Sequence, residues 1–505
     1  MNHAFFRHYR DNVQWMSDMG MSSFRFSISW SRVMHWDAET RKMRPNSQGI
    51  ASYHALLDAL QMKAIQSIVT LYHFDLPLML QTQLEPKGWL NPDIVTHFED
   101  FATLVFREFG SKVKYWATFN EPLTFISRSY GLRDAAPGAV KSSDTNTYTV
   151  GHNVLLSHAK AVAIFRTLKR EETSVVAAGA RIGIVLNAEF GYPVDESDTL
   201  DVEAAERKMQ FDLVWFMTPI MTGEYPEIMR ERVGERLPRF SFEEAALING
   251  SYDVFMLSNY YSRVVTNCDS EHSAIVCDEL PQGHARDRGI DDTRTPSSAR
   301  IPPTDDYVAT IKWLHEKDLS TEILLTDNGR WGNDQVDNLD RLQYFQVYVG
   351  QLYKAVVEEK IPIIGYTAWL PDTNERGSYE PQFGVRDANV TSRSAQGLPR
   401  IPCPAAKWFT HLTTTKCLDG WNQGTIEMNV GEQEEEEEAA PREKMLSSEA
   451  NGNNVGVPWS LDEVMFLLII GVVLFGVITC EAMRELRMSS RGSPEEVQVL
   501  ITIKD

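Results

Sequence analysis

Short apolar runs alternate with longer stretches of helical periodicity over most of this chain of 505 residues. The runs are rich in β-branched and aromatic residues and apolar on both faces, which is typical of strands in a parallel sheet covered by helices. One intervening stretch carries large apolar residues at helical spacing, namely Phe98, Phe101, Leu104, Val105 and Phe109. Seven strands are predicted in this way, over 24–30, 67–73, 115–121, 182–187, 254–261, 322–327 and 363–369.

Repeated strand–helix units of this number predict an α/β fold of the (β/α)8 TIM barrel class. A closed barrel is favoured over an open doubly wound sheet because no glycine-rich phosphate loop follows the first strand. A helix is predicted over 5–19, before that strand, so this chain offers seven strands where a barrel has eight. We therefore expect a barrel that lacks its first strand, either through truncation of the sequence or because the barrel is open.

Polar residues gather at the carboxyl ends of the predicted strands, while the rest of each strand is apolar. A barrel brings these ends to one face, where barrel active sites are built. Capping of the sheet is an equally good interpretation of any single one of them. Together they predict a site made from His73, Asn120 with Glu121, Asn187, Tyr260, Asp327 and Trp369.

Two of these residues, Glu121 and Asp327, are carboxylic acids at the ends of different strands. Glycoside hydrolysis uses such a pair, because one acid protonates the leaving oxygen while the other carboxylate attacks the anomeric carbon or activates water. In the segment TFNEP, Glu121 is the candidate proton donor, and Asn120 can hydrogen-bond a sugar hydroxyl beside it. Asp327 is the candidate partner.

Seven motifs occur in the order found in family 1 glycoside hydrolases, a family with β-glucosidase, lactase and klotho-type members. Together they cover most of the chain before the acidic segment, and so the chain resembles this family. The motifs are FRFSISWSRV (24–33), LYHFDLP (71–77), YWATFNEP (115–122), YGLRDAAPG (130–138), SNYY (258–261), LLTDNG (324–329) and GYTAW (365–369).

The resemblance implies a function for each matched position. Glu121 is implied to be the acid/base and Asp327 to stand in the nucleophile position, in a retaining mechanism that needs no metal or organic cofactor. Arg25 is implied to lie beside the nucleophile, and Tyr260, or Tyr261 if one residue is inserted, to orient it. Trp116 is implied to shape the barrel floor, with ordinary core packing as the alternative for Trp116 and Trp369. The residues implied to bind sugar are His73, Asn120, Tyr260, Trp369 and Glu375.

The sequence departs from the family at two places. Asp327 replaces a glutamate, which withdraws the attacking oxygen by about 1 to 1.5 Å. The two carboxyls are then expected between the separations of about 5 to 5.5 Å and about 6.5 to 9.5 Å that retaining and inverting enzymes use, so turnover is expected to be slow. Arg376 stands where the family has an aromatic residue, and we expect it to form a salt bridge at the rim or, as the alternative, to receive an acidic or phosphorylated sugar.

The remainder of the chain predicts a membrane anchor. Residues 1–425 are assigned to the barrel and 426–462 to an acidic linker without fixed structure. Val464–Cys480 is a run of apolar residues without charge, predicted to be a transmembrane helix. Arginines at 484, 487 and 491 follow it, so the tail 481–505 is predicted to be cytosolic and the barrel luminal or extracellular. This is the topology of a single-pass type I protein, although the chain begins without a signal peptide.

Charge and cysteine content add two expectations. The formal net charge of −21 argues against a nucleic-acid partner, whose phosphates require clustered lysine and arginine. Cys268 with Cys277, and Cys403 with Cys417, are close enough in sequence to pair across short loops, and sequons begin at Asn249 and Asn389. Both features fit a luminal or extracellular location.

Two functions therefore compete. The first is a β-glucosidase or β-galactosidase type of enzyme that hydrolyses a β-linked glycoside or oligosaccharide. The second is a klotho-like binding protein on the membrane whose catalysis is impaired. Retention of Glu121, His73, Asn120 and Arg25 favours the enzyme. The lost strand and the shortened side chain of Asp327 favour the binding protein.

Overall fold

The computed structural model describes residues 6, 8–137, 143–171, 175–293, 308–317, 321–329, 339–368, 404–418 and 421. Nearly all of them belong to one compact unit, which extends to Thr414. No helix in these ranges is long and apolar enough to cross a membrane. The predicted linker 426–462, the predicted span Val464–Cys480 and the tail 481–505 lie outside the described residues, so the membrane anchor stays a prediction.

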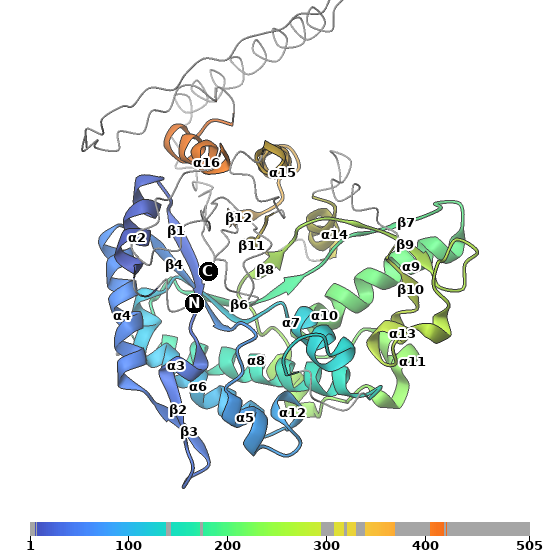
Figure 1. Cartoon of the computed structure of the whole chain (residues 1–505), viewed down its shortest axis with the longest axis horizontal. Helices are drawn as coiled ribbons and strands as arrows, with labels where there is room; N and C mark the ends of the chain where they lie inside the picture. Colours follow the sequence, from blue (N-terminus) through green and yellow to red (C-terminus); the bar gives the residue numbers. More distant parts are fainter. Residues whose placement is uncertain are drawn as a thin grey trace, which may run out of the picture. The chain divides into compact units, whose positions relative to one another are not determined.

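A parallel sheet of seven strands forms the centre of this unit, and its strands are the seven that the sequence predicts (Figure 1). Every neighbouring pair in the sheet is parallel. In spatial order the strands are β1 (Ser23–Ser27), β4 (Gln66–Tyr72), β5 (Tyr115–Asn120), β6 (Arg181–Asn187), β8 (Phe255–Ser258), β11 (Ile323–Asp327) and β12 (Ile363–Tyr366).

The sheet curls around an apolar interior. Residues from strands β4, β5, β6, β8 and β11 meet there in one buried cluster that includes Ile68, Ala117, Val185, Met256 and Leu324. Strands β1 and β12 are the two edges of the sheet in the described part of the chain. The parallel, curled sheet confirms the barrel class.

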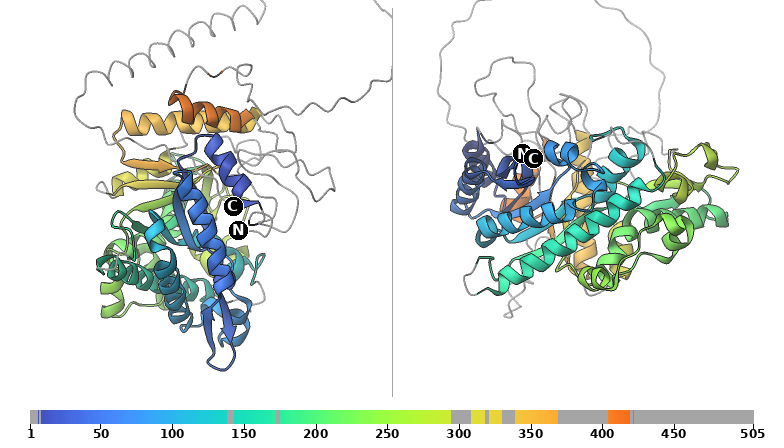
Figure 2. Two further views of the ribbon diagram at one scale, coloured as in Figure 1. Left: turned by 90° about the vertical axis from the view of Figure 1, so that its left-hand side faces the viewer. Right: turned by 90° about the horizontal axis from the view of Figure 1, so that it is seen from below.

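Helices cover the outside of the curled sheet, as the periodicity predicts. Helix α6 packs against α8, the longest helix described, and α8 contacts both β5 and β6 (Figure 2). The helices are α2 (Tyr9–Asp18), α3 (Trp30–Val33), α4 (Ser47–Met62), α5 (Leu78–Gln83), α6 (Ile94–Phe109), α7 (Pro122–Ile126), α8 (Asn146–Arg170), α9 (Thr199–Met209), α10 (Trp215–Thr222), α11 (Glu227–Val233), α12 (Phe242–Ile248), α13 (His284–Arg288), α14 (Ala309–Lys317), α15 (Leu339–Val357) and α16 (Pro404–Thr415).

Two small sheets lie outside the barrel sheet. Strands β2 (Met34–Asp37) and β3 (Lys42–Pro45) form an antiparallel hairpin. Strands β10 (Ile290–Asp291), β9 (Arg263–Asn267) and β7 (Gly191–Pro193) form the other sheet, against which α9 packs.

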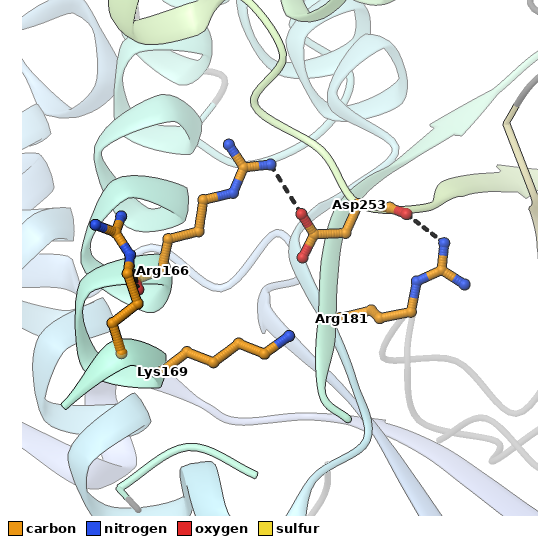
Figure 3. A pocket seen from close by; sticks show the side chains of 5 residues that line it. Arg166, Lys169, Arg181 and Asp253 are labelled. Carbon is orange, nitrogen blue, oxygen red and sulfur yellow. Dashed lines mark hydrogen bonds and ion pairs between the residues drawn. The ribbon is translucent and has the colours of Figure 1, made fainter. Parts of the chain in front are cut away.

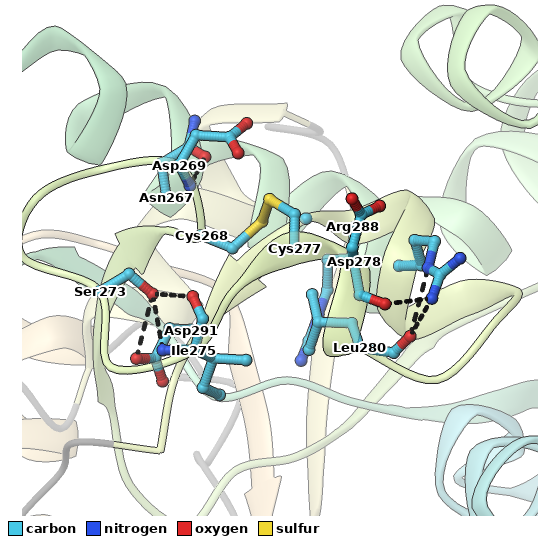
Figure 4. Close-up of a disulfide and its surroundings, with 12 residues drawn as sticks. Asn267, Cys268, Asp269, Ser273, Ile275, Cys277, Asp278, Leu280, Arg288 and Asp291 are labelled. Carbon is cyan, nitrogen blue, oxygen red and sulfur yellow. Dashed lines mark hydrogen bonds between the residues drawn. A yellow bond between two sulfur atoms is a disulfide. The ribbon is translucent and has the colours of Figure 1, made fainter.

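One of the two predicted cysteine pairings is confirmed. A disulfide joins Cys268, directly after β9, to Cys277 (Figure 4). Cys417 is also disulfide-bonded, but Cys403 lies outside the described residues, so their pairing stays a prediction.

Candidate active site

The candidate site lies at the carboxyl ends of the barrel strands, where Asn120 ends β5 and Asp327 ends β11. Both side chains are buried, as is Glu121, which directly follows β5. The ends of parallel strands share one edge of a sheet, so residues 207 positions apart in the chain come to one face of the barrel. This placement agrees with the sequence prediction, while the separation of the two carboxyl groups stays a prediction.

Arg25 on β1 links the parts of the site across the barrel interior. Its Nη1 donates to Asp327 Oδ2 at 2.6 Å and to the carbonyl oxygen of Thr326 at 3.0 Å. Its Nη2 donates to Asn120 Oδ1 at 2.6 Å and to Thr70 Oγ1 at 3.1 Å. Such charge-assisted hydrogen bonds are shorter and stronger than neutral ones, so the guanidinium fixes the orientation of both the Asp327 carboxyl group and the Asn120 amide. The contact implied by the family resemblance is present.

Glu121 has an unusual backbone conformation. Its φ and ψ of 42° and 65° lie in the left-handed region, which residues other than glycine rarely adopt. The next residue, Pro122, begins α7. Strained backbone of this kind is concentrated at functional sites, where surrounding contacts hold it in place.

Two hydroxyl groups position the carboxylate of Glu121. Thr124 Oγ1, one turn later on α7, donates to Oε2 at 3.0 Å, and the Tyr260 hydroxyl donates to Oε1 at 3.3 Å. The amide of Asn187, which ends β6, in turn donates to Thr124 Oγ1 at 3.0 Å. Three strand ends thus contribute to holding one carboxylate.

Tyr260 contacts Glu121, and the expectation that it also orients Asp327 stays a prediction. Strand β8 ends at Ser258, which is in register with Asp327, and Ser258 Oγ lies 3.5 Å from Asp327 Oδ2. Tyr260 is two residues further along, and its hydroxyl reaches Glu121. Tyr261, the alternative, accepts a hydrogen bond from Arg263.

An irregularity in β5 decides which of its side chains enter the site. The pairing of β5 with β6 shifts register between Ala117 and Asn120. Before the shift, Ala117 belongs to the interior cluster, whereas Trp116 packs edge-on against Phe106 of α6 on the helix side. After it, Asn120 faces Arg25 in the interior. A bulge of this kind re-aims a side chain. Trp116 thus packs in the core against α6, and its contribution to the barrel floor stays a prediction.

The remaining predicted residues have less structural support. His73 directly follows β4, is half-buried and contacts the ring of Phe74. Trp369, Glu375 and Arg376 lie outside the described residues, so their roles stay predictions.

Several residues that support the site escaped the sequence analysis. Thr124 was identifiable, because it stands three residues after Glu121, a spacing that brings two side chains together on one face of a helix. Asn328, beside Asp327, donates to Tyr344 at 2.7 Å and accepts from Tyr366 at 2.7 Å. These contacts join residues far apart in sequence, and no local pattern indicates them.

Burial alters the titration of two groups near the site. Burial raises the pKa of Asp75, in the loop after β4, to about 6, and a hydrogen bond from Ser29 opposes this shift. Burial lowers the pKa of His158 on α8 to about 3, so its ring is neutral where its Nδ1 meets Thr118 Oγ1 at 2.7 Å. His158 thus ties α8 to the strand that carries the site.

Potential metal ligands in the described part of the chain lie on the small sheet and its surroundings. One set contains Cys268 and Cys277, which are consumed by their disulfide. The other contains Asp198, Asp201 and His272, where Asp201 accepts hydrogen bonds from Thr266 and from the Asn267 amide. We interpret this second set as a hydrogen-bonded structural cluster.

Comparison with known proteins finds one family and many relatives. The family model for Glycosyl hydrolase family 1 matches residues 2–418. Beta-glucosidase 25 of Oryza sativa subsp. japonica is 32% identical over 438 residues, covering 81% of this chain and 84% of the relative. Lactase/phlorizin hydrolase of Rattus norvegicus is 32% identical over 426 residues, covering 81% of this chain and 21% of the relative.

Solved structures agree. A β-glucosidase from the fungus Humicola insolens in complex with glucose is 28% identical with a TM-score of 0.70, covering 82% of this chain and 88% of that chain. A rice β-glucosidase is 30% identical with a TM-score of 0.71, covering 81% and 87% of the two chains.

Proposed function

Because the chain belongs to glycosyl hydrolase family 1, we propose that it hydrolyses β-linked O-glycosides of the β-glucosidase or β-galactosidase type. The observation that carries this proposal is that the buried Arg25 side chain hydrogen-bonds both Asp327 and Asn120, the residue before Glu121. A binding protein that had lost catalysis would have no need of this buried arrangement. Relatives named as β-glucosidases support the substrate class.

The proposed reaction has two displacements. In the first, Asp327 attacks the anomeric carbon, and the glycosidic bond breaks as protonated Glu121 gives its proton to the leaving oxygen. In the second, Glu121, now ionised, removes a proton from water, which attacks the same carbon and releases Asp327. Arg25 orients the Asp327 carboxyl group for the first step through the 2.6 Å contact.

Sugar binding is proposed for the polar groups around this pair. The Oδ1 atom of Asn120 accepts from Arg25, which orients its amide nitrogen as the group that donates to a sugar hydroxyl. His73 follows β4 and Tyr260 lies two residues beyond β8, at the same end of the sheet, and Trp369 and Glu375 are proposed partners by family resemblance.

Asp327 is proposed to limit the rate. Its side chain is one methylene shorter than glutamate, and a displacement of about 1 Å at a reacting centre costs up to about a hundredfold in rate. The hydrogen bond from Arg25 Nη1 to Asp327 Oδ2 also keeps this carboxyl group on the side of the barrel where β1 lies. Slow turnover by the natural sequence follows.

The test is hydrolysis of an aryl β-glucoside by the purified protein. We expect weak activity in the natural sequence, an increase in Asp327→Glu, and loss in Glu121→Gln, because the amide cannot donate and recover the proton. Glu99→Gln, which changes a carboxylate bonded to Lys160 on the outer helices, is the matched control and should retain full activity.

Absence of hydrolysis in the natural sequence and in Asp327→Glu, together with sugar binding by both, would contradict the proposal and support the binding protein. Retention of activity in Glu121→Gln would contradict the assignment of the acid/base.

We further propose that Val464–Cys480 anchors the chain as a type I membrane protein with a luminal or extracellular, N-glycosylated barrel. The uncharged apolar run and the arginines after it support this topology. The Cys268–Cys277 disulfide is typical of proteins in oxidising compartments.

After alkaline carbonate extraction of expressing cells, the full chain is expected in the membrane fraction and a variant without residues 464–480 in the supernatant. Full release of the intact chain would contradict the anchor.

A further inference from the structure

A cationic pocket lies at the end of the barrel opposite the candidate active site. It has a volume of about 550 Å³, and its wall consists of Arg166, Lys169, Arg170, Arg181 and Asp253 (Figure 3). Four cations and one carboxylate meet in this pocket, although the whole chain carries a net charge of −21. The local excess of positive charge opposes the overall charge of the molecule.

The position of the pocket follows from the elements that build it. Arg181 begins β6, Asp253 stands just before β8, and Lys169 and Arg170 end α8. These are the amino ends of the strands, whereas the candidate site uses the carboxyl ends. Strand β6 has seven residues, so the two ends are separated by roughly 20 Å at about 3.3 Å per residue. The pocket is therefore distinct from the site that carries Glu121 and Asp327.

Two of the four cations are fixed by the barrel itself. Arg166 Nη2 donates to Asp253 Oδ1 at 2.8 Å and to the carbonyl oxygens of Gly250 at 3.0 Å and Tyr252 at 3.1 Å. Arg181 donates to the carbonyl oxygen of Asp253 and forms an ion pair with Glu322. These contacts hold two guanidinium groups in a defined arrangement and neutralise part of their charge.

The other two cations have neutral partners. Lys169 Nζ donates to the carbonyl oxygen of Ala180 at 2.7 Å, and Arg170 Nε donates to that of Arg166 at 3.0 Å. Within the part of the chain that the structure describes, neither side chain forms an ion pair. In Figure 3, Lys169 extends from α8 toward the strand that carries Arg181. Even if Asp253 and Glu322 cancel two of the four charges, an excess of two positive charges remains.

We propose that this pocket binds a small soluble anion with phosphate or sulfate groups. Tetrahedral oxyanions accept several hydrogen bonds at once, and arginine and lysine donors bind them through charge-assisted contacts. The volume lies within the range of small-molecule sites and exceeds that of one phosphate, so a ligand with two such groups is also accommodated. This proposal does not depend on the hydrolytic activity proposed above.

The competing interpretation is structural. Polar residues at the amino ends of barrel strands commonly contribute to stability alone. Arg166 and Arg181 do so through their contacts with Asp253. Lys169 and Arg170 distinguish the two interpretations, because neither has an acidic partner among the described residues. A structural function would gain from them only the modest stabilisation that cations provide in the last turn of a helix.

The test measures binding of inorganic phosphate and of pyrophosphate to the purified full chain by calorimetry at physiological ionic strength. We expect saturable binding of both, tighter for pyrophosphate, and no binding of acetate at the same concentrations. Lys169→Gln with Arg170→Gln should weaken binding by about a hundredfold, since each hydrogen bond to a charged group contributes about tenfold. Lys160→Gln, on the same helix but paired with Glu99, is the matched control and should bind like the natural chain.

Binding that is absent in the natural chain, or equally strong in the double variant, would overturn the proposal. Binding to vesicles of phosphatidylcholine with phosphatidylserine, without binding of either soluble anion, would also overturn it and identify a membrane contact instead. Unchanged thermal unfolding of the double variant without ligand would support a binding function over a structural one, and a large decrease in its melting temperature would oppose it.

Discussion

At the scale of single residues, the candidate site depends on the hydroxyl groups that hold the Glu121 carboxylate. Thr124 donates to Glu121 while accepting from Asn187, so that Asn187 at the end of β6 helps to orient the proposed acid/base Glu121. Tyr260 supplies the second hydroxyl to the same carboxylate. Glu121 itself lies in a strained conformation, so contacts that define its side chain also help to define its backbone.

We predict that Thr124→Val lowers kcat/KM for an aryl β-glucoside by about tenfold, the effect of one hydrogen bond of about 1 to 1.5 kcal/mol. Thr124→Ser keeps the hydroxyl and is expected to retain most of the activity. Steady-state kinetics of both variants provide the measurement. Equal losses in the two would show that the methyl group, rather than the hydroxyl, matters.

At the scale of elements, β5 and α8 form the support of the site. Strand β5 carries Asn120 inward after its register shift, and its outward Thr118 meets His158 of α8. His158 is completely buried, which explains why its pKa lies at about 3. The packing of this helix on this strand therefore requires a neutral histidine.

This burial makes stability depend on pH. The unfolded chain takes up a proton on His158 near pH 6.5, whereas the folded chain does so only near pH 3. The stabilising contribution is therefore fully present above pH 6.5 and is lost as the pH falls, by up to about 1.4 kcal/mol per pH unit. Between pH 7 and pH 4.5, urea unfolding is expected to show that His158→Gln loses less stability than the natural chain. An identical slope in the variant would contradict the prediction.

At the scale of the whole molecule, the buried Arg25–Asp327 pair joins two strands that are not neighbours in the sheet. Arg25 and Asp327 are 302 residues apart, and the pair forms only when the sheet has curled far enough to bring β1 opposite β11. Catalytic geometry and closure of the fold are thus linked through one side chain.

We predict that Arg25→Gln lowers the free energy of unfolding by about 3 to 5 kcal/mol, because Asp327 is left as an uncompensated buried charge. Adding Asp327→Asn removes that charge and is expected to recover part of the loss. Urea unfolding of the two single variants and the double variant measures the coupling. Strictly additive losses would contradict it.

The sequence by itself determined the elements and the end of the barrel at which the site lies. Buried parallel strands are apolar on both faces, so runs such as 115–121 and 182–187 were identifiable without a partner strand. Their carboxyl ends share one face of a barrel, which is why Glu121 and Asp327 were identifiable as a pair. The short loop between Cys268 and Cys277 made their disulfide predictable as well.

Only the tertiary structure decided which way individual side chains point and what they meet. The register shift in β5 turns Asn120 inward and leaves Trp116 in the core, and the end of β8 at Ser258 lets Tyr260 reach Glu121. The cationic pocket likewise unites Arg166, Arg181 and Asp253 from separate elements. Register and cross-barrel contacts depend on pairing between distant segments, and no local pattern of hydrophobic and polar residues encodes that pairing.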